Sequence, residues 1–349
     1  MKIGIVLHPY GEDKPAGLAR TIFEYTKGML EVDDKNEYII FVKNQPRKNP
    51  DFPGKNWQLY TLGGGVSWLE RLRSAPRADV YIFNTPVMPL TWNPPRAIVI
   101  ALDFAYWYLS PWTPKGQIVK YGTYLYNLFS LWKADHIVAV SQATKEETIK
   151  LFKIPEEKIT VVYCGFKKIC SLPEVEVSLP EKFILFVGVI KPRKNVFNTV
   201  KAFRIFQKTH SDYFLVLVGP VGGEYYTALA NYIKEHNIEE KVKFLGFLSD
   251  GQISYVYKRA HLFVFPSLIE GLGQPVLEAM DCGVPVITSN QSALKEAGGN
   301  NSALLIDPYN PDDIAKAMCD IIENPNVRAN YIEKGRAQAH RFSWNKAGL

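Results

Sequence analysis

Short apolar runs alternate with amphipathic segments along nearly the whole chain. The runs are typical of buried strands in a parallel sheet, which lack the polar alternation of a half-exposed strand. The intervening segments place apolar residues at helical spacing, as at Val196, Val200 and Phe203. The predicted strands are residues 2–7, 37–42, 57–60, 80–83, 97–102, 136–140, 158–163, 183–187, 214–218, 242–245, 262–265, 284–288 and 303–306. The predicted helices include residues 18–30, 117–133, 143–152, 312–323 and 328–341, with others between the later strands.

The regular order of strand and helix predicts an α/β protein with parallel sheets. A chain of 349 residues is long enough for two such domains. Residues 164–181 have weak periodicity, two prolines and mixed charge, so we place the linker there. The predicted domains are therefore residues 1–170 and 171–349.

Residues 265–289 contain several candidate ligand-binding residues close together in the sequence. Glu270 and Glu278 flank a glycine-rich loop, and Pro275 suits the first position of a helix, where its missing N–H is not needed. We expect this helix at residues 275–282, with Glu278 in its first turn. Free N–H groups at a helix start bind phosphate, and carboxylates accept hydrogen bonds from hydroxyls. A nucleotide-sugar offers both groups, although a glutamate at this place can also simply complement the helix dipole.

A second candidate turn follows the apolar run 183–187. Arg193 and Lys194 stand between this run and the next helix, and Asn195 is a typical N-cap for that helix. Ligands of α/β folds bind at such strand-to-helix turns. Arg binds phosphate through its planar donor fork, and Lys binds it as a point charge. A solvated basic turn would contain the same residues, so both interpretations stay open at this point.

Together these segments resemble the donor site of retaining glycosyltransferases of the GT-B fold, family 4 (glycosyl transferases group 1). The similarity is strong from Phe183 onward and weak before about His136. The resemblance implies two doubly wound Rossmann-like domains facing a cleft. It also implies an enzyme that moves a sugar from a nucleotide-diphosphate sugar, UDP- or GDP-linked, to a saccharide or lipid-linked acceptor. The first domain would bind the acceptor and the second the donor.

The resemblance also assigns roles to single residues. Glu270 would orient the donor sugar, and Glu278 would hold the ribose. Arg193 and Lys194 would take the charge that develops on the leaving diphosphate. The implied catalytic residues are Asp103, Arg193, Lys194 and Glu270. The implied donor-binding residues are Gly17, Gly188, Phe247, Leu248, Gly271, Leu272, Gly273, Gln274 and Glu278.

The matches in the first half are individually weaker. Gly17 follows the first strand, where family members have a glycine turn facing the donor phosphates, and Gly11 is a poorer match. Asp103 ends a strand and would face the cleft, or it is an ordinary turn residue. Ser141 also ends a strand, and we expect it to cap the next helix.

No bound metal or other cofactor is implied. The chain has no Asp-x-Asp pair, and Cys164, Cys170, Cys282 and Cys319 show neither metal-ligand spacing nor a pairing pattern. A reducing, cytoplasmic setting is the simplest expectation. The apolar runs are too short to span a membrane, and the N-terminus does not read as a signal peptide.

Positive charge is concentrated in the first half. Residues 1–170 contain 22 Lys and Arg against 16 Asp and Glu, whereas residues 171–349 contain 19 of each. The first half also carries aromatic residues such as Trp107 and Tyr108. Basic and aromatic surface can dock on an anionic membrane, so we expect peripheral contact with the inner membrane face or a lipid-linked acceptor. The alternative is scattered surface charge over aromatic core residues. Nucleic acid is not expected, because no binding motif accompanies the charge.

The sequence departs from the family at several positions. Leu102 stands where many members have a His that contacts the donor sugar, Cys164 replaces a usual Asn, and Gln274 replaces a usual apolar residue. Five residues follow the Phe-Ser-Trp segment 342–344, where members continue into a long helix that returns to the first domain. Two alternatives therefore stay open: a nucleotide-sugar epimerase or phosphorylase of the same fold, and a catalytically silent nucleotide-binding scaffold subunit.

Overall fold

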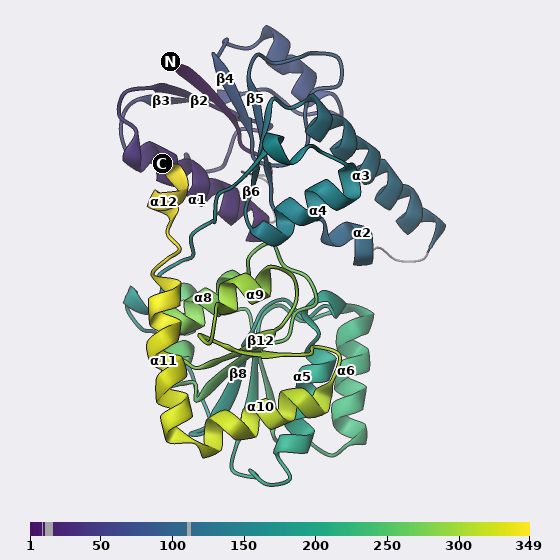
Figure 1. The fold of residues 1–349 in the computed structure, drawn as a ribbon, viewed down its shortest axis with the longest axis vertical. Helices are drawn as coiled ribbons and strands as arrows, with labels where there is room; N and C mark the ends of the chain where they lie inside the picture. Colours follow the sequence, from purple (N-terminus) through teal and green to yellow (C-terminus); the bar gives the residue numbers. More distant parts are fainter. Residues whose placement is uncertain (9, 11–16, 110–112) are drawn as a thin grey trace. The chain divides into compact units, whose positions relative to one another are not determined.

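The computed structural model describes residues 1–8, 10, 17–109 and 113–349. These residues form two compact units (Figure 1). The first unit consists of Met1–Gly165 together with Ser343–Leu349, and the second of Phe166–Phe342. Gly11, the poorer of the two glycine matches, lies outside the described residues.

The first unit is built on a parallel sheet of seven strands in the order β3-β2-β1-β4-β5-β6-β7. The strands are β1 (Lys2–Val6), β2 (Glu37–Val42), β3 (Trp57–Thr61), β4 (Val80–Phe83), β5 (Ala97–Ala101), β6 (His136–Ala139) and β7 (Ile159–Val161). The helices are α1 (Gly17–Val32), α2 (Ala105–Leu109), α3 (Pro114–Lys133), α4 (Gln142–Phe152) and α12 (Trp344–Gly348). Phe41 of β2 packs in one core with Phe83, whereas its neighbour Ile40 packs in a second core with Ile5. The sheet is thus buried on both faces, as its apolar runs predict.

The second unit has a parallel sheet of six strands in the order β10-β9-β8-β11-β12-β13. The strands are β8 (Phe183–Val187), β9 (Phe214–Val218), β10 (Val242–Gly246), β11 (Leu262–Phe265), β12 (Val286–Ser289) and β13 (Leu304–Ile306). The helices are α5 (Val196–Phe206), α6 (Gly223–Glu235), α7 (Asp250–Arg259), α8 (Gln274–Asp281), α9 (Ser292–Gly298), α10 (Pro311–Glu323) and α11 (Pro325–Ala339). Strand order reverses between β1 and β4 in one sheet and between β8 and β11 in the other. Each unit is therefore doubly wound and Rossmann-like, which confirms the predicted fold class.

Local signals account for most element boundaries. Ser141 caps α4 as expected, because its hydroxyl accepts the N–H of Thr144 at 3.1 Å. The helices α2 and α12 were not predicted, since five residues are too few to show a helical period. Among the helices of the described residues, none has the length and apolar character needed to cross a membrane.

Residues 343–349 pack on α1 of the first unit. The rings of Tyr25 and Trp344 meet edge-on with centroids 5.2 Å apart. A side chain at Gly28 would collide with the backbone of Trp344, so this glycine permits the close approach. The predicted division had placed these residues in the second domain. A returning segment is thus present, as the single short helix α12, where the sequence had indicated none.

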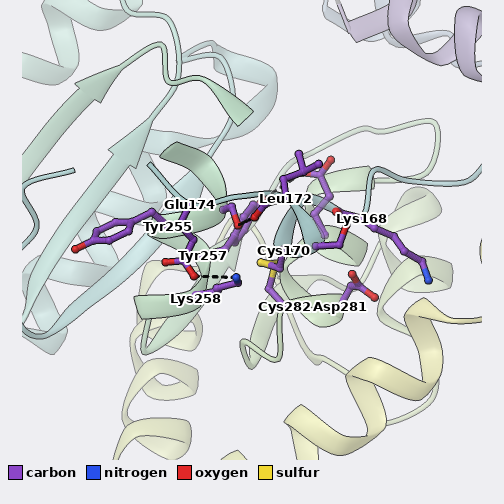
Figure 2. Close-up of a disulfide and its surroundings, with 12 residues drawn as sticks. Lys168, Cys170, Leu172, Glu174, Tyr255, Tyr257, Lys258, Asp281 and Cys282 are labelled. Carbon is purple, nitrogen blue, oxygen red and sulfur yellow. Dashed lines mark hydrogen bonds and ion pairs between the residues drawn. A yellow bond between two sulfur atoms is a disulfide. The ribbon is translucent and has the colours of Figure 1, made fainter. Parts of the chain in front are cut away.

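Residues 166–181 of the predicted linker belong to the second unit. Cys170 forms a disulfide with Cys282, which joins the 3-10 turn η3 (Ile169–Ser171) to the end of α8 (Figure 2). Glu174 accepts a hydrogen bond from Lys258 at 2.8 Å (Figure 2). It accepts a second one from Arg259 at 2.6 Å. No pairing pattern is visible in the sequence, because these two cysteines are 112 residues apart and only the fold makes them neighbours.

Candidate active site

The two predicted donor segments meet at the switch point of the second sheet. β8 and β11 are neighbouring parallel strands, so their carboxyl ends lie at the same edge. The 3-10 turn η4 (Pro192–Lys194) follows β8, and residues 266–273 follow β11. This edge is where open α/β sheets bind ligands. The structure therefore brings together Lys194 and Glu270, which are 76 residues apart in the sequence.

Lys194 and Glu270 form a buried ion pair. Lys194 Nζ donates to Glu270 Oε1 at 2.6 Å, and the two side chains are 12% and 9% exposed. The same ammonium lies 4.8 Å from the centre of the Phe265 ring, a cation–π contact. The resemblance implies separate ligand roles for these two residues, and their contact with each other was not predicted.

Several groups hold Glu270 in its charged form. Burial favours the neutral acid, but the charges of Lys194 and Arg193 outweigh it and lower the pKa of the carboxyl below its usual value. Hydrogen bonds from Lys194 and from Ser267, whose Oγ lies 2.5 Å from Glu270 Oε1, act in the same direction. An ionised carboxylate accepts hydrogen bonds only, so it can orient hydroxyl groups of a ligand.

Backbone contacts lock the two loops together. The Arg193 carbonyl accepts the N–H of Leu268 at 2.9 Å and lies 3.0 Å from Ser267 Oγ. Asn195 adopts a left-handed backbone with φ of 56° and does not cap α5 with its side chain, contrary to the prediction. Its amide donates instead to the carbonyls of Pro266 and Pro308, at 3.1 and 2.6 Å. The left-handed turn aims that amide across the sheet edge, which a sequence pattern does not reveal.

The glycine-rich loop leads directly into α8. Gly273 has a φ of 94°, and a side chain there would strike Leu294, so glycine is required on both grounds. In this part of the described chain no side chain caps the helix, which begins at Gln274 with Pro275 in its first turn. Glu278 was expected in that first turn but lies one turn further along, because the helix starts earlier than predicted.

Glu278 has a neighbour that the sequence did not indicate. The hydroxyl of the fully buried Tyr257, on α7, lies 3.4 Å from Glu278 Oε2 and 3.4 Å from the Pro275 carbonyl. Burial, and then the charge of Glu278, raise the pKa of Tyr257 well above its usual value. The phenol therefore stays protonated and can orient the carboxylate by donating to it.

The other predicted donor residues of the second unit differ in exposure. The N–H of Gly188 is used in the sheet, where it donates to Val218 at 2.8 Å, and Leu272 and Leu248 are buried. Phe247 is 82% exposed, so it presents its ring to solvent just after β10. Of the two residues expected to flank a base, only Phe247 has a side chain available for stacking.

The predicted residues of the first unit lie at different positions in that unit. Gly17 is the first residue of α1. The carboxylate of Asp103 accepts the N–H of Ala105 at 3.1 Å, the turn arrangement that had been its alternative role. Leu102 packs partly buried against the core cluster of Ile5.

Comparisons with known proteins agree with this architecture. The family model described as "Glycosyl transferases group 1" matches residues 173–338, and that described as "Glycosyltransferase Family 4" matches residues 21–167. The chain is 31% identical over 274 residues to O-antigen chain mannosyltransferase B of Escherichia coli, covering 76% of this chain and 71% of that protein.

Solved structures with the same fold include glycosyltransferases. Sucrose-phosphate synthase from Thermosynechococcus elongatus superposes with a TM-score of 0.79 at 17% identity, over 100% of this chain and 96% of that one. HepE from Anabaena, solved in complex with UDP and glucose, gives a TM-score of 0.75 at 18% identity, over 100% and 97%. The chain belongs to the group 1 (family 4) glycosyltransferases and is an enzyme of that class.

Proposed function

We propose that this glycosyltransferase moves a hexosyl group from a UDP- or GDP-linked sugar to a hydroxyl of a saccharide or lipid-linked acceptor, retaining the anomeric configuration. The observation that carries the proposal is the buried Lys194–Glu270 pair, 2.6 Å apart, at the sheet edge where two loops and the start of α8 meet. One site thus offers a cation for phosphate and an anion for sugar hydroxyls.

In this proposal the residues act on different parts of the donor. Arg193 and Lys194 stabilise the negative charge that builds on the leaving diphosphate, an interaction that is stronger in the transition state than in the ground state. Glu270, already fixed by Lys194 and Ser267, orients the sugar, and Glu278 holds the ribose. Of the first unit, Gly17 is proposed as a donor-binding residue and Asp103 as a catalytic residue.

The diphosphate site requires no divalent metal in this proposal. Arg193 and Lys194 are the residues proposed to face the leaving diphosphate. Both are cations, so they repel a metal ion and themselves stabilise the negative charge that a metal would otherwise stabilise. Amide groups of residues 271–274 complete the anion site at the start of α8. A charged hydrogen bond contributes about 1.5–3 kcal/mol, so removal of any one of these residues should weaken donor binding by about that free energy.

The relatives support two donor classes. The similar protein of Escherichia coli is named a mannosyltransferase, and the similar fold of HepE was solved with UDP and glucose. We therefore propose mannose as the first donor sugar to test and glucose as the second. Each sugar should be tested as both its UDP-linked and its GDP-linked form.

Calorimetric titration of the purified chain with UDP and then GDP, with and without EDTA, tests the donor site. Binding of one nucleotide, unchanged by EDTA, is expected, and a donor screen with the matching sugars would follow. The product's anomeric configuration, read by NMR, tests retention. Binding that EDTA abolishes would overturn the metal-free site. Release of a free sugar-phosphate would indicate a phosphorylase, and formation of an epimerised nucleotide-sugar without an acceptor would indicate an epimerase.

The proposed acceptor side includes contact with an anionic membrane through α3. This helix packs one face on the core through Leu131, yet its other face is also apolar. Figure 1 shows α3 along the outside of the first unit. An exposed apolar stripe of this kind marks an interaction surface, and Lys115 and Lys120 supply positive charge near it. The exposed stripe consists of Ile118, Val119, Tyr121, Leu125, Phe129 and Trp132.

Vesicle co-sedimentation tests this contact. Binding to vesicles containing phosphatidylglycerol is expected, with weaker binding to phosphatidylcholine alone. Leu125→Glu should reduce binding, whereas Val66→Glu, at a fully exposed apolar residue outside the stripe, should not. Equal binding of both variants would exclude α3 as the docking surface without affecting the donor-site proposal.

A further inference from the structure

His210, Cys319 and Glu323 gather at the carboxyl-terminal ends of α5 and α10. His210 lies in the turn after α5, and the other two are one helical turn apart on α10. Ligand atoms of all three lie within 4.8 Å of one another. Imidazole, thiolate and carboxylate together form a donor set that suits Zn²⁺.

A hydrogen bond holds His210 at Nδ1, and its Nε2 faces Glu323. The Thr209 hydroxyl lies 2.9 Å from Nδ1 and 3.2 Å from the Phe206 carbonyl. Coordination of Zn²⁺ by Nε2 would require Nδ1 to carry the proton and donate it to this hydroxyl. Stacking on Phe206, with centroids 4.3 Å apart, fixes the ring. Metal-bound histidines are held in this way, with the second nitrogen hydrogen-bonded.

The spacing of two of the ligand atoms fits a shared cation. His210 Nε2 lies 3.3 Å from Glu323 Oε1. A direct charge-assisted hydrogen bond would be shorter, about 2.7–2.9 Å. Two ligands of one tetrahedral Zn²⁺, each about 2.0–2.1 Å from the ion, lie roughly 3.3 Å apart.

Negative charge near Cys319 suits a cation. Glu323 is itself a proposed ligand, and Asp320 directly follows Cys319 in α10. A bound divalent ion would offset the carboxylate charge and deprotonate the coordinating thiol. The side chain of Glu323 is 56% exposed, so an ion and a water molecule as fourth ligand can reach the site from solvent.

We infer that His210, Cys319 and Glu323 bind one Zn²⁺ ion, which joins the end of α10 to the turn after α5. α5 has 11 residues, so its two ends are about 16 Å apart. Lys194 lies just before the start of that helix, which keeps the zinc site separate from the donor site. The role is structural: the ion fixes the helix that follows the diphosphate-binding residues.

Titration of the metal-stripped full chain with Co²⁺, followed by displacement with Zn²⁺, tests the site. One ion per chain is expected, with a near-ultraviolet thiolate-to-cobalt absorption. Cys319→Ser should abolish that absorption, whereas Cys164→Ser, in the first unit, should keep it. Thr209→Val leaves all three ligands but removes the hydrogen bond to His210, so it should weaken binding about 10–100-fold.

Two further variants guard against loss of the fold. Glu323→Gln changes an exposed side chain and should weaken binding more than Thr209→Val, with an unchanged circular dichroism spectrum. His210→Gln should do the same, while His236→Gln, at a histidine outside the cluster, should bind as the wild type does. No binding by the wild type, or equal affinity in folded Cys319→Ser and Glu323→Gln, would overturn the inference.

Discussion

Lys194 Nζ lies 2.6 Å from Glu270 Oε1, so one buried ion pair joins the loops that follow two neighbouring strands. Such a pair gains Coulomb attraction but costs desolvation of both charges, and the net stabilisation is small. Removing one partner is different, because the other charge is then buried and unpaired. The pair therefore makes the geometry of the donor site depend on both residues at once.

The first prediction concerns this coupling. Lys194→Met and Glu270→Gln should each lower the free energy of unfolding by about 3–5 kcal/mol, whereas the double variant should lose clearly less than the sum. Chemical denaturation of the four proteins measures the coupling. Lys182→Met, which breaks the exposed pair with Asp212, is the control and should change stability little. Strict additivity would show that Lys194 and Glu270 do not stabilise each other.

The second prediction concerns nucleotide binding. Arg193→Gln removes a proposed diphosphate contact and should weaken binding of the preferred nucleoside diphosphate roughly tenfold to hundredfold, the equivalent of about 1.5–3 kcal/mol. Glu278→Gln should weaken the same binding through the ribose. Arg204→Gln is the matched control, since Arg204 lies on the later part of α5 and donates to the hydroxyl of Tyr232 on α6. Calorimetric affinities of Arg193→Gln and Glu278→Gln equal to that of the wild type would refute the site assignment.

The fold could be predicted from the sequence in some detail, because buried parallel strands are visible as continuous apolar runs. The runs 183–187, 214–218 and 262–265 coincide with β8, β9 and β11. The order of strands in the sheet, by contrast, is set by which helix crosses which face, so the adjacency of β8 and β11 was not available from local pattern alone.

The candidate site shows the same division. The glycine-rich loop and the basic turn stand out because their residue types are tied to backbone geometry, as at Gly273. The contacts between them depend on side chains from distant segments. Tyr257 is one of several tyrosines in amphipathic helices, and nothing in its local sequence points to Glu278. Cys170 and Cys282 were missed for the same reason.

The third prediction concerns pH. The pKa of Glu270 is lower in the folded chain than its ordinary value of 4.5, so the folded state binds this proton less readily than the unfolded state. The resulting stabilisation is complete above pH 4.5 and is lost as pH falls through the lowered pKa. Stability of the wild type should therefore fall more steeply in acid than that of Glu270→Gln. Parallel curves of unfolding free energy against pH would mean that protonation of Glu270 does not affect folding stability.

The fourth prediction concerns the disulfide. Cys170 and Cys282 close a loop that spans 112 residues and tie the start of the second unit to the end of α8. Closing a loop of this length restricts the unfolded chain, so breaking it should lower the free energy of unfolding by about 2–5 kcal/mol. Denaturation with and without dithiothreitol, repeated on Cys170→Ala/Cys282→Ala, measures the effect. The reductant should destabilise the wild type and leave the double variant unchanged; an equal response of both proteins would mean that this bond does not stabilise the chain.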